Sequence, residues 1–163
     1  MIKLLENMKK IVKFAMVLFV ALTAVACSNN DNIGDEYLDV TPNNISGTWK
    51  MESFDNGMVW PEGVYYYITF NRKERSFVSY DNTDSMGEMG AVRRSGKFDI
   101  VTNESAVIYG VFDYGGGDWE YRFYVRELTK DRMVWVAVND ANIVQVYVRA
   151  ELPEWLPKDE DKK

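Results

Sequence analysis

Hydrophobic and polar side chains alternate with a period of two through most of the chain after residue 45. The clearest case is the segment 119–128, in which Trp119, Tyr121, Phe123 and Val125 alternate with Glu120, Arg122, Tyr124 and Arg126. Successive side chains of a β-strand point to opposite faces, so this pattern predicts a strand with one buried face. No convincing helical period follows Cys27, which predicts an all-β fold.

Eight segments of this kind follow one another, separated by turn-forming residues. They are 47–54, 64–70, 75–80, 91–100, 105–112, 119–128, 132–138 and 143–150. In the second segment, Tyr66, Ile68 and Phe70 share the face that we expect to be buried. In the last, Ile143 and Tyr147 oppose three valines, which predicts a strand covered on both faces.

The connections between these segments differ in length in a regular way. The first, third and fifth are the longest, at 55–63, 81–90 and 113–118, and the others have three or four residues. In an up-and-down meander, alternate connections lie at the same end of the sheet. The sequence therefore predicts an eight-stranded antiparallel up-and-down barrel, with tight turns at one end and the three long loops around a mouth at the other.

The first 26 residues have the features of a secretory signal. Four lysines precede residue 14, an apolar run covers 14–22, and small residues follow up to Cys27. A positive head, a short apolar middle and a small-residue exit predict a leader that is removed at residue 26.

Cys27 is the only cysteine in the chain, and it stands where this leader ends. Residues 22–27 resemble a bacterial lipoprotein signal, whose cysteine is acylated and becomes the first mature residue, although Ala24 stands where that family usually has Leu. The alternative is an ordinary cleavage site formed by Ala24 and Ala26, and both hypotheses place the cut before Cys27. Acylation is favoured because ordinary cleavage would leave a free thiol in an oxidising compartment.

The remaining chain divides by composition into three parts. Residues 27–44 are rich in Asn and Asp and are expected to form a flexible acidic tether, 45–151 form the barrel, and 152–163 are a C-terminal tail. Trp155 and Leu156 of the tail are expected to pack on the outside of the barrel. Loss of the leader removes four lysines and Glu6 from 19 basic and 25 acidic residues, which leaves 15 against 24, a net charge of −9. Such an acidic protein is not expected to bind nucleic acid.

Three motifs in the predicted barrel resemble the lipocalin-like lipoproteins of Gram-negative bacteria. Gly47-Thr48-Trp49 matches the Gly-x-Trp that opens the first lipocalin strand, Arg149 matches the basic residue that ends the last, and 128–135 is similar to the turn and seventh strand. The resemblance covers residues 45–151. It implies a lipocalin-like barrel that binds a small hydrophobic ligand and is anchored by lipid in the cell envelope, at the outer membrane.

Gly47, Trp49 and Arg149 are the predicted barrel-closing residues. The first and last strands are neighbours in a closed barrel and run antiparallel, so both Trp49 and Arg149 belong at the tight-turn end. We expect the guanidinium of Arg149 to lie over the Trp49 indole, a contact that contributes about 0.5 to 2 kcal/mol. The alternative is that Trp49 is a plain core residue and Arg149 is solvated.

The residue inventory excludes most catalytic chemistry. The chain has no His, and the hypothesis above assigns its single Cys to acylation, so His-based acid–base catalysis, Cys–His nucleophiles and the usual zinc sites are not expected. Carboxylates gather in two of the long loops, at Asp81, Asp84, Glu88, Asp113 and Asp118, but their spacing does not fit a calcium-binding loop. We therefore expect no enzyme activity, no metal and no cofactor.

Apolar side chains in the long loops suggest a ligand site at the mouth. The candidates are Met58, Trp60, Met86, Met89 and Tyr114 from the loops, and Tyr66, Trp119, Tyr121 and Trp135 from the strands. Flexible methionines and flat rings suit an adaptable rim for an apolar or aromatic ligand. In the alternative, Trp60 and the methionines fold inward and fill the barrel, which then acts through its surface or loops as a protein-interaction or inhibitor domain of the envelope. The interior volume beneath the Trp60 loop distinguishes the two, because an eight-stranded barrel can be filled or can hold one small ligand.

Overall fold

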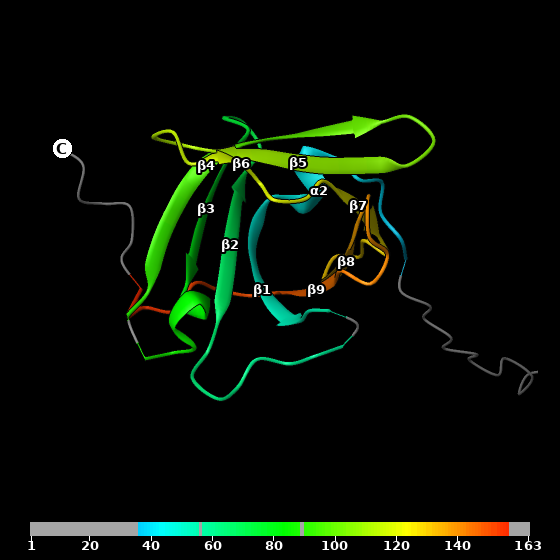
Figure 1. The fold of residues 1–163 in the computed structure, drawn as a ribbon. Helices are drawn as coiled ribbons and strands as arrows, with labels where there is room; N and C mark the ends of the chain where they lie inside the picture. The colour runs from blue at the N-terminus through cyan, green and yellow to red at the C-terminus, as the bar shows by residue number, and fades with distance from the viewer. Residues whose placement is uncertain (1–35, 56, 89, 157–163) are drawn as a thin grey trace, which may run out of the picture. The chain divides into compact units, whose positions relative to one another are not determined.

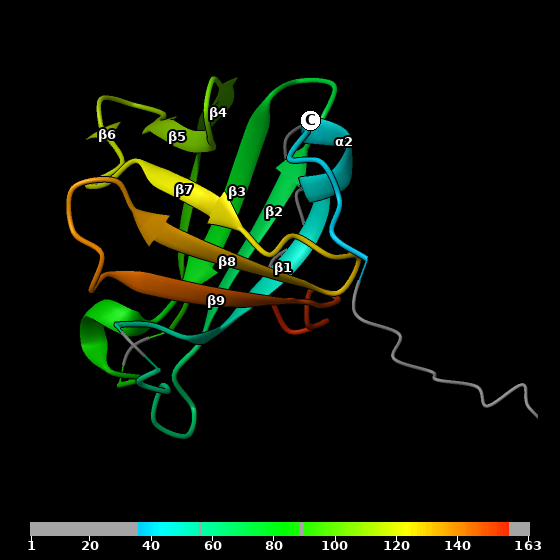
Figure 2. The ribbon, with the colours of Figure 1, turned by 90° about the vertical axis from the view of Figure 1, so that its right-hand side faces the viewer.

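The computed structural model describes residues 36–55, 57–88 and 90–156. In this part of the chain, antiparallel strands close into a barrel (Figures 1 and 2). The strands are β1 (Gly47–Ser53), β2 (Tyr66–Asn71), β3 (Ser76–Asp81), β4 (Val92–Thr102), β5 (Ala106–Phe112), β6 (Gly117–Asp118), β7 (Phe123–Arg126), β8 (Arg132–Ala137) and β9 (Val144–Arg149). The short helix α2 (Pro42–Ile45) precedes β1, and the 3-10 helix η1 (Thr83–Ser85) lies between β3 and β4.

The strand pairing confirms the predicted closed eight-stranded barrel. Strands β1 to β5 pair in chain order, β7 pairs with β5 and β8, β8 pairs with β9, and β1 pairs with β9 to close the ring. Strand β6 has two residues and extends only the tip of the β5 hairpin, where Phe112 pairs with Gly117. The predicted strand 119–128 is therefore divided: β7 begins at Phe123, although the Trp119 N–H still donates to the Gly110 carbonyl at 2.8 Å.

The barrel interior is an apolar core formed by inward-facing side chains. In β7, Phe123 and Val125 are buried while Arg126 is exposed, as the period of two requires. The buried core comprises Ile45, Trp49, Met51, Ile68, Phe70, Phe77, Phe98, Ile108, Phe123, Val125, Leu128, Met133, Trp135, Ala137 and Tyr147. Ring contacts connect much of it, including Phe70 with Phe98 at 5.0 Å between centroids.

The segment before β1 corrects the predicted extent of the tether. The Leu38 N–H donates to the Leu128 carbonyl at 2.7 Å, and both Leu38 and Val40 pack against the barrel core. Thr41 caps α2 by accepting a hydrogen bond from the Asn44 N–H, Pro42 occupies its first turn, and Ile45 is fully buried. Three spaced apolar residues thus attach this segment to the barrel despite the Asn and Asp between them, so the packed domain includes Leu38.

The tail packs on the outer face of the barrel. Leu156 is buried beside Tyr67 and Tyr80, whose side chains point outward from β2 and β3. Trp155 remains 65% exposed, but its ring contacts Tyr65 edge-on at 5.0 Å. Within the described ranges, no helix has the length and apolar character needed to cross a membrane.

Candidate functional site

The tight-turn end of the barrel is closed by Arg149. Its guanidinium carbon lies 3.7 Å from the centroid of the Trp49 ring. Its N–H groups donate to three carbonyl oxygens, those of Ser46 at 2.6 Å, Asn44 at 3.1 Å and Lys130 at 3.1 Å. The Trp49 indole N–H donates to the Ile45 carbonyl at 2.8 Å. These contacts join the first and last strands to the segment before β1.

Gly47 leaves the space that this arrangement needs. Its φ of +105° is a conformation that side chains other than glycine rarely adopt, and a Cβ atom there would lie 3.0 Å from Nη1 of Arg149. Burial lowers the pKa of Arg149, and the charge of Asp131 opposes that shift.

A cavity of about 600 Å³ lies toward the mouth. Residues from four connections line it: Trp60 before β2, Thr83 and Asp84 before β4, Glu120 and Tyr121 before β7, and Ile143 before β9. Two of the three predicted long loops, 55–63 and 81–90, therefore meet at the cavity, whereas no residue of 113–118 lines it. The remaining lining residues are Met51, Phe54, Asp55, Tyr66, Ser79, Asp81, Arg94, Phe112, Trp119, Phe123, Trp135, Gln145 and Tyr147.

Aromatic rings form the apolar wall of this cavity. Trp135 is 2% exposed, and its ring centroid lies 4.8 Å from Tyr147, 5.3 Å from Phe123 and 5.6 Å from Trp119. Trp60 stacks on Phe54 with centroids 4.0 Å apart and planes inclined by 20°. Trp60 thus belongs to the wall, and space remains beside it.

Two indole N–H groups in this wall meet no acceptor. The Nε1 atoms of Trp60 and Trp135 are both buried, and neither has a hydrogen-bond partner within residues 36–55, 57–88 and 90–156. A buried donor without an acceptor costs about 1 to 3 kcal/mol. An acceptor supplied by a ligand in the cavity would remove that cost.

Trp119 reaches the cavity because a glycine faces it. Gly110 is buried in β5, and a Cβ atom at this position would lie 2.4 Å from the Trp119 ring. Any side chain at residue 110 would displace the indole from the wall.

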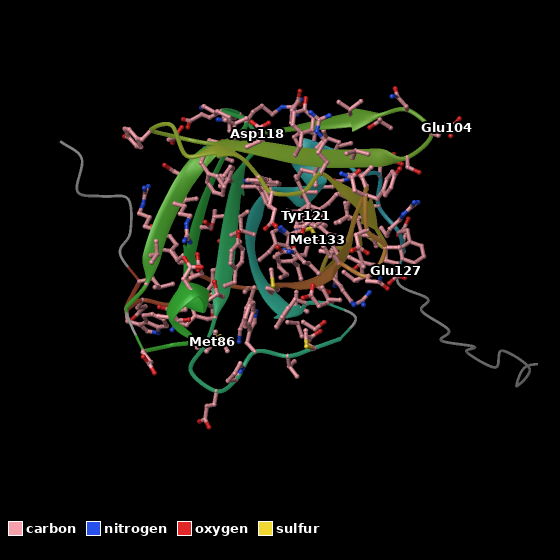
Figure 3. The ribbon with its side chains drawn as sticks, in the orientation of Figure 1. Met86, Glu104, Asp118, Tyr121, Glu127 and Met133 are labelled. Atoms are coloured by element: carbon pink, nitrogen blue, oxygen red, sulfur yellow. The ribbon has the colours of Figure 1, made fainter. Side chains whose placement is uncertain are left out.

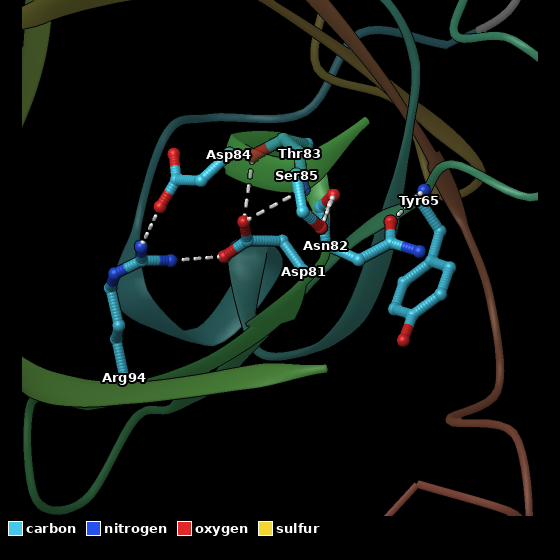
Figure 4. A network of polar contacts seen from close by, with 7 residues as sticks. All are labelled: Tyr65, Asp81, Asn82, Thr83, Asp84, Ser85 and Arg94. Atoms are coloured by element: carbon cyan, nitrogen blue, oxygen red, sulfur yellow. Dashed lines mark hydrogen bonds and ion pairs between the residues drawn. The ribbon is translucent and has the colours of Figure 1, made fainter. Parts of the chain in front are cut away.

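A polar network forms the opposite part of the wall (Figure 4). Asp81 at the end of β3 is 1% exposed; it forms an ion pair with Arg94 of β4 and accepts a hydrogen bond from the Thr83 hydroxyl at 2.7 Å. Arg94 also contacts Asp84, at 2.6 Å. One guanidinium thus bridges two carboxylates, and the buried carboxylate is compensated by a charge and a hydroxyl donor.

Asn82 joins the same network to the loop before β2. Its side-chain oxygen accepts a hydrogen bond from the Tyr65 N–H at 2.9 Å, and its side-chain nitrogen donates to the Gly63 carbonyl at 3.0 Å. The connection that contains η1 is therefore hydrogen-bonded to the connection before β2, beside the cavity.

Several tyrosines near the cavity have perturbed acidity. Burial raises the pKa of Tyr66 to about 12; the charge of Asp81 adds to the shift, and the charge of Arg94 opposes it. Burial, with a smaller effect of Tyr66, raises the pKa of Tyr147 well above its usual value. Both phenols therefore stay neutral at physiological pH and remain able to donate a hydrogen bond.

The structure places the predicted ligand-binding residues in two groups. Trp60, Tyr66, Trp119, Tyr121 and Trp135 line the cavity.

Three other candidates do not line it. Met58 and Met86 are 52% and 58% exposed, and Tyr114 is 91% exposed beside a separate pocket of about 370 Å³. Figure 3 shows Met86 near η1, away from Tyr121 inside the ring of strands. Met89 lies outside the described residues, as does Cys27. A binding role for these four candidates stays a prediction.

The polar wall is what the sequence analysis missed. Ser79 and Asp81 follow the buried Phe77 at a spacing of two along β3, and Arg94 precedes Gly96 and Phe98 at the same spacing along β4. Extending the period of two from these phenylalanines would have pointed Asp81 and Arg94 inward. The predicted loop 81–90 includes Asp81, and carboxylates in loops are normally solvated.

A metal is not indicated by this arrangement. Within the part of the chain that the structure describes, no three His, Cys, Asp or Glu side chains gather in a way that could hold a metal ion. Asp81 and Asp84 both contact Arg94, which occupies the space between them with a positive charge.

Comparison with known proteins gives one family match. The model described as "Lipocalin-like domain" matches residues 45–135, which is more than half of the chain. No curated protein matches the chain.

Proposed function

Because the chain belongs to the family of lipocalin-like domains, we propose that its barrel binds one small, largely apolar ligand in the cavity at its mouth. The observation that carries this proposal is a cavity of about 600 Å³ whose aromatic wall includes Trp60 and Trp135, two indoles whose buried N–H groups have no acceptor among the described residues. Ligand pockets typically have volumes of roughly 300 to 1,000 Å³ and combine apolar walls with a few polar groups.

The position of Trp60 favours a hollow barrel over a filled one. The filled barrel requires the Trp60 loop to occupy the interior, whereas Trp60 stacks on Phe54 at the side of the cavity. A binding role also agrees with the family, because the lipocalin-like fold generally serves binding and not catalysis.

The alternative function rests on the loops. Met58, Val59, Met86 and Tyr114 expose 52% to 91% of their surface at connections around the mouth. Exposed apolar side chains of this kind suit contact with an envelope protein, as an interaction or inhibitor domain would need.

The proposal extends to the location of the protein. The leader and Cys27 in the sequence support acylation of Cys27 and anchoring at the outer membrane of the cell envelope. Intact-mass measurement of membrane-extracted protein tests this: the mature chain should begin at Cys27 and carry acyl chains. Recovery of soluble, unmodified wild-type protein that behaves like Cys27→Ala would refute it.

Ligand binding is tested with mature protein and material extracted from the envelope. A ligand should quench tryptophan fluorescence saturably and raise the melting temperature. Trp60→Ala should weaken binding by about 1 to 3 kcal/mol, because the ligand loses a wall of apolar surface. Trp60→Phe, which keeps a ring against Phe54, separates the loss of the N–H from the loss of the stack.

Trp155→Ala is the matched control, because this indole lies on the outer face and is mostly exposed. It should leave binding unchanged. A melting temperature that never responds to any extract, together with strong destabilisation by Trp60→Ala, would instead favour the filled barrel and the loop-based function.

A further inference from the structure

We infer that the cavity selects ligands that combine an apolar or aromatic body with a positively charged group, such as an amine, and that it discriminates against carboxylates. This inference rests on the proposed function, because it names the chemical class of the ligand for the same cavity. It depends on which charged side chains line the cavity and on which of them already have an ion-pair partner.

The wall of the cavity is predominantly negative. It contains the carboxylates of Asp55, Asp81, Asp84 and Glu120, and among the described lining residues Arg94 is the one with a positive charge. A cavity lined by one sign of charge with apolar walls concentrates ligands of the opposite sign.

Arg94 is not available to hold an anionic ligand. Its Nη1 contacts the buried carboxylate of Asp81, and its Nη2 lies 2.6 Å from Asp84. These two carboxylates already balance the positive charge of the guanidinium, so a ligand carboxylate would have to compete with them for it. Displacing Asp81 would leave a buried carboxylate without its ion pair, which is strongly unfavourable.

Two carboxylates of the wall remain without a cation. Neither Asp55 nor Glu120 forms an ion pair within the described ranges, and both are exposed enough to receive a charged group from solvent. They belong to different connections, before β2 and before β7, and they line the same cavity.

Tyr121 senses the charge at this place. Hydrogen bonding with Glu120 is the main cause that raises the pKa of Tyr121; burial and the charges of Glu120, Asp140 and Asp55 raise it further. Asp140 comes from a third connection, between β8 and β9. Carboxylates from three connections therefore act on one ring of the cavity wall.

The floor of the cavity is a second, independent indication of a ligand. Trp135 is 2% exposed and its N–H has no acceptor in the described part of the chain. The neighbouring rings of Trp119 and Tyr147 offer apolar faces, and aromatic faces also attract cations. A ligand with a ring against the faces of Trp119 and Tyr147 and its positive group near Glu120 would use the aromatic wall and the negative charge together.

Three probes with the same ring and different charges test the inference. Naphthylethylamine, naphthylethanol and naphthylacetate are a cation, a neutral molecule and an anion at neutral pH. Each is titrated into the mature protein by calorimetry, with thermal melts in parallel. The amine should bind most tightly and the acetate most weakly, and added salt should narrow the difference because it screens exposed charges.

Glu120→Gln and Asp55→Asn, made separately, should each weaken binding of the amine by about three- to tenfold and leave the affinity for the alcohol unchanged. Glu104→Gln is the matched control, because Glu104 is an exposed glutamate in the turn between β4 and β5, far from Met86 at the mouth (Figure 3). It removes one negative charge, as Glu120→Gln does, so an equal loss of amine affinity in these two single variants would overturn the inference.

The remaining outcomes separate this inference from the proposed function. Equal or tighter binding of naphthylacetate would overturn the charge selectivity and leave ligand binding intact. If none of the probes titrates and no envelope extract shifts the melt, the cavity does not bind ligands, and both proposals fall together. Melts of each variant without probe establish that the barrel remains folded.

Discussion

The guanidinium carbon of Arg149 lies 3.7 Å from the centroid of the Trp49 ring, and the two residues face each other across the pairing of β9 with β1. One contact thus joins the last strand of the barrel to the first. It also closes the tight-turn end, so that the cavity lies toward the long loops.

Arg149→Lys should lower the free energy of unfolding by about 1 to 3 kcal/mol. Lysine keeps the positive charge, but its ammonium cannot reproduce a planar group that stacks on Trp49 while donating to three carbonyl oxygens. Urea unfolding followed by far-ultraviolet circular dichroism measures the change.

Arg126→Lys is the control for this substitution. The guanidinium of Arg126 also lies over a ring, that of Tyr124 at 4.9 Å, but the residue is exposed on the outside of β7. Its replacement should cost less than about 0.5 kcal/mol. Similar losses of unfolding free energy for both variants would mean that Arg149 stabilises the barrel no more than an exposed arginine does.

Gly47→Ala should destabilise the protein more than Gly57→Ala. Both glycines have similar positive φ angles, +105° and +98°, so both substitutions strain the backbone. Only at Gly47 would the new Cβ approach another group, Nη1 of Arg149 at 3.0 Å; nothing described lies within 4 Å of a Cβ at Gly57. We expect about 1 to 3 kcal/mol at Gly47 and about 1 kcal/mol at Gly57, measured by urea unfolding. Equal costs would show that backbone strain alone matters.

Asp81→Asn and Asp84→Asn should differ strongly, although both carboxylates contact Arg94. Asp81 is buried, and its replacement leaves the guanidinium without its buried partner, which should lower the free energy of unfolding by about 2 to 4 kcal/mol. The Asp84 side chain is 73% exposed, so its loss should cost less than about 1 kcal/mol. Thermal melts at fixed pH compare the two, and equal shifts would contradict the structural distinction between them.

Tyr66 should make stability fall at high pH. Its pKa of about 12 in the folded barrel exceeds the usual value of 10.0, so the folded state retains a proton that the unfolded state loses. The stabilisation is complete below pH 10 and disappears as pH rises to about 12, with a loss of about 2 to 3 kcal/mol from this residue.

Tyr66→Phe should therefore reduce the decline between pH 9 and pH 12, measured by urea unfolding at each pH. Tyr37→Phe, on a ring that is 67% exposed, is the control for the loss of a phenol. If the free energy of unfolding of Tyr66→Phe declines with pH as steeply as that of the wild type, burial does not raise the pKa of Tyr66.

The sequence by itself determined the strands, the all-β class and the antiparallel order of the barrel. A period of two is a local property: Phe123 and Val125 point inward because they alternate with Tyr124 and Arg126, whatever lies opposite. Loop lengths, which are equally local, predicted that the long connections 55–63 and 81–90 meet at one end. The family motif placed Gly47, Trp49 and Arg149 at the closure, because the first and last strands of a barrel must be neighbours.

The tertiary structure alone decided the contents of the cavity and the direction of the loop side chains. Asp81 and Arg94 meet because of the register between β3 and β4 and the fold of η1, which are long-range properties that no window of sequence contains. Met58, Met86 and Trp60 are all apolar residues of the loops. Trp60 stacks on Phe54 and lines the cavity, whereas Met58 and Met86 are exposed. The volume that remains beside Trp135 is the difference between the size of the barrel and the side chains packed inside it, and only three-dimensional packing determines that difference.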